Sequence, residues 1–147
     1  MRRIKTLFGT VLAITASALF LAGCSNSPKP EESATAFLNA YLSADYATAA
    51  AMCTEELSAF LNESVKEFEA LPDSVKSIIK RHTSYMTPHV DSIARTGSQD
   101  TLVVCYTIVK NDPADTLATG TAEQLINSRL SIVKEGEEWK VAALNEI

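Results

Sequence analysis

Residues 101–110 read Thr-Leu-Val-Val-Cys-Tyr-Thr-Ile-Val-Lys, and this stretch has the strongest strand character in the chain. It is rich in β-branched residues, and it is apolar on both faces of the strand. This pattern predicts a strand in the centre of a sheet. The polar tetrapeptide Gly-Ser-Gln-Asp at residues 97–100 predicts the turn that precedes it.

Three further strands are predicted on either side of this central one. Residues 86–96 predict a strand that Pro88 makes either an edge strand or a bent one, because proline has no backbone N–H to donate. Residues 121–134 predict a long strand. A tight turn at Glu-Gly-Glu (135–137) then leads to the last strand, residues 138–147, which carries Trp139.

The preceding half of the chain has a helical pattern. Apolar residues recur at helical spacing from Ala34 to Leu42, and Asp45 is placed to cap a short helix over residues 46–53. Two more apolar stripes predict two more helices, one before and one after Pro72: Leu57, Phe60, Leu61, Val65 and Phe68, and then Val75, Ile78 and Ile79. Helices followed by antiparallel strands indicate one α+β domain, which we assign to residues 33–147.

The first 24 residues have the pattern of an export signal. A basic start (residues 1–5) precedes an uncharged apolar run (residues 6–20). The next four residues, Leu-Ala-Gly-Cys, resemble the lipobox of bacterial lipoproteins. We therefore expect residues 1–23 to be a lipoprotein signal peptide and Cys24 to receive the acyl chains that anchor the protein to a membrane. The alternative is an ordinary signal peptide or membrane anchor in which Cys24 occurs by chance.

Residues 24–32 are polar and contain two prolines, which predicts a flexible tether between anchor and domain. By resemblance to Gram-negative lipoproteins, Ser25 in place of Asp implies the outer membrane within the cell envelope. The net charge is −5 and becomes about −8 once the three cations of the signal peptide are removed. This acidity argues against nucleic acid as a partner, because it repels phosphate.

Three segments resemble the nuclear-transport-factor-2-like superfamily, whose cone-shaped fold is also called cystatin-like. They are Ser-Ala-Asp-Tyr-Ala-Thr-Ala (43–49), Asp-Thr-Leu-Val-Val (100–104) and Leu-Ser-Ile-Val-Lys-Glu-Gly-Glu-Glu-Trp-Lys-Val (130–141). The chain is most similar to the small lipoproteins of unknown function in that superfamily, some of them labelled lumazine-binding-like. The resemblance implies a curved antiparallel sheet wrapped around helices, with a concave face that often forms a pocket. Superfamily members include enzymes, ligand binders and assembly scaffolds.

Two cysteines, Cys53 and Cys105, remain after acylation of Cys24. In an oxidising compartment they predict a disulfide between the second helix and the central strand. The alternative is a pair of free cysteines that behave as small apolar residues in the core. The sequence leaves both interpretations open.

Residues that suit a binding site or an active site are few. Tyr41, Tyr85, Tyr106 and Trp139 each combine an aromatic body with a polar atom, so they either line a ligand pocket or belong to the core. The resemblance places an Asp and a Tyr in the cone of related enzymes, which Asp45 and Tyr41 match, although helix capping already explains Asp45.

The chain contains two histidines, His82 and His89, whose spacing is not that of a metal site. We therefore expect no metal, no cofactor and no catalytic residue.

These observations predict a non-enzymatic, lipid-anchored module that binds a small apolar ligand or an envelope protein. Two alternatives stay open. One is a hydratase-like or isomerase-like enzyme. The other is an assembly scaffold that forms a homodimer through an open sheet face.

Overall fold

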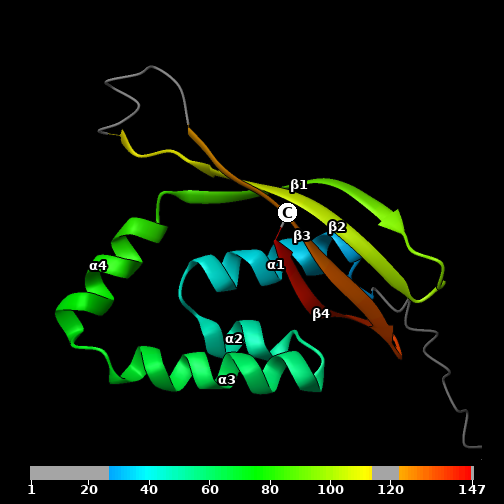
Figure 1. Cartoon of the computed structure of the whole chain (residues 1–147), viewed down its shortest axis with the longest axis horizontal. Helices are drawn as coiled ribbons and strands as arrows, with labels where there is room; N and C mark the ends of the chain where they lie inside the picture. The colour runs from blue at the N-terminus through cyan, green and yellow to red at the C-terminus, as the bar shows by residue number, and fades with distance from the viewer. Residues whose placement is uncertain (1–26, 114–122, 147) are drawn as a thin grey trace, which may run out of the picture.

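The computed structural model of the chain describes residues 27–113 and 123–146, so Cys24 and the predicted signal peptide lie outside the described residues. The helices come first along the chain and the strands follow (Figure 1). The helices are α1 (Pro30–Leu42), α2 (Tyr46–Ala51), α3 (Glu55–Ala70) and α4 (Asp73–Thr83). The strands are β1 (Met86–Arg95), β2 (Thr101–Lys110), β3 (Glu123–Glu135) and β4 (Glu138–Glu146).

The strands form one open antiparallel sheet in the order β1-β2-β3-β4. The predictions of a central strand at 101–110 and of an edge strand containing Pro88 are therefore confirmed. The α+β class is also confirmed, whereas the cone-shaped fold is not. Three of the nine residues of the predicted tether, Pro30 to Glu32, form the first turn of α1.

The core lies between one face of the sheet and the helices. Alternate residues of β2 (Leu102, Val104, Tyr106 and Ile108) are buried. They meet Phe37 and Leu38 of α1 and Leu61 of α3 in one cluster. The intervening β2 residues point to the other face and remain partly exposed. β2 is therefore apolar on both faces and lies inside the sheet. The described helices cover one of these two faces.

The helices form two layers beneath the sheet, with α1 next to the strands and α2 and α3 below it (Figure 1). The segment between α2 and α3 pairs with the outer edge of β4. Val141 donates its backbone N–H to the carbonyl of Met52 (3.0 Å), and its own carbonyl accepts from the N–H of Thr54 (2.9 Å). These bonds cover part of an edge that would otherwise offer free backbone groups.

The turn between α1 and α2 brings two tyrosines together. Ala44 adopts a left-handed conformation (φ 57°), which ends α1. The side chain of Asp45 then accepts a hydrogen bond from the N–H of Thr48 (3.2 Å), so the predicted N-cap of α2 is confirmed. As a result, Tyr41 at the end of α1 and Tyr46 at the start of α2 face each other.

The predicted apolar stripes of α3 and α4 are buried less than expected. Phe60 is 67% exposed, and none of the α4 side chains is buried, including Val75 and Ile78. The reason is the position of α4, which leaves the helix layers and connects α3 to β1 at one end of the molecule (Figure 1). Among the described residues, no helix is long and apolar enough to cross a membrane.

The different burial of Phe37 and Phe60 predicts that replacing each by alanine lowers the free energy of unfolding by a different amount. Phe37→Ala removes a fully buried ring and should lower the free energy of unfolding by about 3–5 kcal/mol. Phe60→Ala, the matched control on an exposed ring, should change it by about 0.5 kcal/mol or less. Urea unfolding of the chain from Ser25 to Ile147 measures both values. Equal losses would show that the core is assigned wrongly.

Candidate binding cleft

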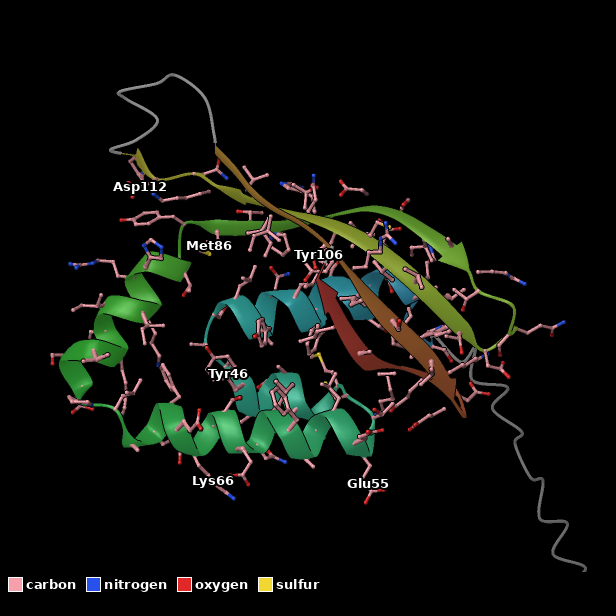
Figure 2. All side chains as sticks on the ribbon, viewed as in Figure 1. Tyr46, Glu55, Lys66, Met86, Tyr106 and Asp112 are labelled. Carbon is pink, nitrogen blue, oxygen red and sulfur yellow. The ribbon has the colours of Figure 1, made fainter. Side chains whose placement is uncertain are left out.

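A continuous series of aromatic contacts connects the core to the end of the molecule at α4. The ring of Phe37 stacks on Tyr41 with centroids 5.8 Å apart. Tyr41 meets the edge of Tyr46 at 5.6 Å, and Tyr46 meets the edge of Phe68 at 5.5 Å. Figure 2 labels Tyr46 at the start of α2, between α1 and α3. Edge contacts at these distances hold rings in defined orientations, so α1, α2 and α3 position one another here.

Two hollows flank the contact between Tyr46 and Phe68, and we call them together the aromatic cleft. The first has a volume of about 360 Å³ and is lined by Tyr41, Tyr46, Ser64, Glu67, Phe68, Leu71 and Ile79. The second has a volume of about 290 Å³ and is lined by Ala44, Asp45, Tyr46, Ala47, Val65, Phe68, Glu69, Lys76 and Lys80. The aromatic rings thus form a wall that both hollows share, and α4 closes the far side.

Charges of both signs border the second hollow. The ammonium of Lys80 lies 6.0 Å from the centroid of the Phe68 ring, within the range of a cation–π contact. The Lys76 side chain is 26% exposed, and its ion pair with the fully exposed Asp73 is long, at 3.4 Å. A pair of this kind contributes little, so Lys76 can interact with an anionic group in the cleft.

The carboxylate of Asp45 stands on the same border. The hydrogen bonds from Thr48 hold its pKa below the ordinary value, and the positive charge of Lys80 acts in the same direction. Asp45 therefore stays ionised well below neutral pH, which suits a helix cap. A group with this pKa is a poor general base at neutral pH.

The four aromatic residues predicted to line a pocket have different surroundings. Tyr41 lines the aromatic cleft. Trp139 lines two other hollows, of about 420 and 410 Å³, beside the start of α1. Tyr106 is buried between the sheet and α1 (Figure 2), and Tyr85 is partly buried just before β1.

Sequence reasoning missed two residues of the aromatic cleft, Tyr46 and Phe68. Phe68 was assigned to a buried stripe from its helical spacing, which is the same for a core residue and a cleft residue. The sequence signal for Tyr46 is its position directly after Asp45, the residue that caps α2.

The two remaining cysteines are free thiols. Cys53 is buried in the core, where its Sγ donates to the carbonyl of Ala49 (3.2 Å). Cys105 alternates with the buried Val104 and Tyr106, so it points to the opposite face of the sheet. The geometry matches the free-thiol alternative rather than the disulfide. Within residues 27–113 and 123–146, no group of three acidic, histidine or cysteine side chains is placed to hold a metal ion.

Comparison with known proteins corrects the predicted family. No family model matches the chain, and neither does any curated protein. One similar solved structure is the solution structure of RPA3114, a SEC-C motif containing protein from Rhodopseudomonas palustris. It is 10% identical, with a TM-score of 0.48, over 82% of this chain and 80% of that one. A similarity this weak carries no argument about function.

The prediction that the chain is a nuclear-transport-factor-2-like lipoprotein is wrong, because the comparisons found a SEC-C motif protein and no member of that superfamily. Two of the three segments behind it form a helix cap at Asp45 and a tight turn at Gly136, and such local features do not specify a fold. The prediction of lipid attachment does not depend on that family. It comes from residues 1–24, outside the described residues, and stays a prediction.

The two thiols should differ in reactivity. Burial raises the pKa of the Cys53 thiol to about 11. At pH 8 its thiolate fraction is then about one in a thousand, and the thiolate is the reactive form. We expect iodoacetamide to modify Cys105 first at pH 8, and Cys53 only after unfolding or as the pH approaches 11. Mass spectrometry of the modified peptides measures this order, with Cys105→Ser as the control. Faster modification of Cys53 in the folded chain would contradict it.

Proposed function

We propose that the chain is a lipid-anchored protein of the cell envelope whose domain binds a small apolar ligand in the aromatic cleft. The observation that carries this proposal is the set of three rings, Tyr41, Tyr46 and Phe68, which three helices hold around one pair of hollows. Tyr41 is 36% exposed although it stacks on the core residue Phe37. A ligand that covers these rings removes apolar surface from water.

The border of the cleft suggests what the ligand carries besides an apolar body. Lys76 and Lys80 stand on α4, and Asp45 and Glu69 stand on the elements opposite. An apolar or aromatic body with an acidic group would place its ring against Phe68 and its charge near the lysines. The carboxylates would favour molecules that also carry a donor or a cation. An amphiphile of a few hundred Å³ fits these features.

Binding fits the cleft better than catalysis does. Asp45 already caps α2 and is ionised, and the Cys53 thiol is protonated within the core. Neither group has a pKa near neutrality, where acid–base catalysis is most effective. These features favour a binding module over the enzyme alternative.

The open face of the sheet favours a second candidate, the homodimeric scaffold. Val103, Cys105 and Val109 of β2 lie on this face, together with Val133 of β3, and all four are partly exposed. Polar side chains interrupt this apolar surface. Asp91 of β1 accepts a hydrogen bond from Thr107 of β2 (2.6 Å). The mass of the chain in solution distinguishes a dimer from a monomer.

Lipid attachment supplies the first test of this proposal. Cells that express the full chain and receive a fatty-acid probe should label the wild-type protein. Cys24→Ser should remain unlabelled, because serine lacks the thiol that forms the thioether. Label in both proteins, or an unlabelled wild type that retains Met1, would contradict the anchor.

The aromatic cleft supplies the second test. Tyr46→Leu removes a ring from both hollows, and it should weaken the binding of anilinonaphthalene sulfonate, an aromatic anion, by about 2-fold to 10-fold. Tyr85→Leu, the matched control, lies outside both hollows and should leave the Kd unchanged. A fluorescence titration measures both. Equal affinity of the two variants would show that the probe binds elsewhere.

A further inference from the structure

A contact at the other end of the molecule involves Ser27, the first residue that the structure describes. The hydroxyl of Ser27 donates a hydrogen bond to the carboxylate of Glu137 (3.0 Å). Glu137 lies in the tight turn between β3 and β4, where Gly136 adopts a positive φ of 64°. The start of the described chain is therefore placed beside the tip of a β-hairpin.

The next residues continue along the same end of the sheet. Pro28 lines one hollow together with Trp139, and Pro30 lines the second hollow on the other side of Trp139. Ser27 thus contacts the β3–β4 turn, and Pro28 and Pro30 lie beside Trp139 near the start of β4. This segment is positioned against the domain over its described length.

The length of chain beyond this contact limits the position of the lipid. Two residues, Ser25 and Asn26, separate Cys24 from Ser27. Three residue steps span at most about 11 Å when fully extended. Acyl chains on Cys24 would therefore enter the bilayer within about 11 Å of Ser27, whose side chain contacts Glu137 at the end of the sheet.

We propose that this end of the domain, formed by the β3–β4 turn and Trp139, lies against the phospholipid surface, and that the aromatic cleft points away from it. This inference rests on the proposed lipid anchor. Helix α1 connects the two ends, because Pro30 borders the Trp139 hollow and Tyr41 borders the aromatic cleft. The eleven residue steps between them span about 17 Å of helix. Figure 1 shows the β3–β4 turn and α4 at opposite ends of the molecule.

The chemistry of this end suits a zwitterionic bilayer. Trp139 is partly buried and offers an apolar ring with one N–H donor, a combination that favours the boundary between headgroups and acyl chains. The charges around it have both signs. Lys140 pairs with Glu138 (3.0 Å), and Lys134 and Glu135 lie near the turn. Such a surface matches headgroups that carry both charges, whereas a strongly anionic bilayer would repel the glutamates.

The tryptophan itself allows the test, because it is the single one in the chain. The full lipid-anchored protein is reconstituted into phosphatidylcholine vesicles in which part of the lipid carries a nitroxide on its headgroup. Trp139 fluorescence should be quenched strongly. In the control, Trp139→Phe combined with Ile78→Trp moves the reporter to an exposed position on α4, and quenching should fall several-fold.

A second variant tests the short connection. A Gly/Ser insertion of about ten residues between Asn26 and Ser27 keeps the Ser27 contact but adds a flexible segment whose root-mean-square length is roughly 16–19 Å. Quenching of Trp139 should then decrease. Equal quenching of the two reporters in vesicle-bound protein, or no change on insertion, would overturn the proposed orientation. A protein that does not float with the vesicles would contradict the lipid anchor instead, so the two failures are distinguishable.

Discussion

The alternation of β2 between buried and partly exposed residues is the constraint on which the rest of the structure depends. Every second side chain, from Leu102 to Ile108, is buried in the same cluster as Phe37 and Leu38 of α1. Because residues in a strand alternate with a period of two, shifting the register by one residue would turn the opposite set inward and expose the core. The register of β2 therefore fixes which face of the sheet receives the helices, and it leaves the other face open.

The helix layers follow from that choice of face. Once α1 lies on the sheet, the left-handed residue Ala44 and the cap at Asp45 send the chain back beneath it. Backbone bonds from Met52 and Thr54 then attach the second layer to the edge of β4. The first three helices already cover the inner face of the sheet, and α4 lies outside these layers at one end of the molecule. Its apolar side chains stay exposed, and the aromatic cleft lies in the angle that it forms with α3.

Much of this fold was predictable from local patterns, and the parts that were not depend on distant contacts. The strands follow from β-branched apolar runs separated by turn residues, and the cap at Asp45 follows from a side chain that satisfies its own helix, so the sequence alone predicts them. The exposure of Phe60 and Ile78 could not be predicted, because helical spacing identifies an apolar stripe but not whether another element reaches it. The aromatic cleft was missed for the same reason. Tyr41, Tyr46 and Phe68 belong to three helices, and nothing in their spacing shows that the rings meet.

The two ends of α1 lie beside two different surfaces of the molecule. At its start, two prolines lie beside Trp139 and leave a short connection to Cys24. At its end, Tyr41 opens the aromatic cleft, and a single rigid helix separates the two regions. A flexible tether would let the domain turn freely, so the cleft would sample every orientation toward the membrane. The contact between Ser27 and Glu137 shortens the free connection instead. With the lipid anchor that we propose at Cys24, a binding site in the aromatic cleft would meet ligands from the aqueous side rather than from the bilayer.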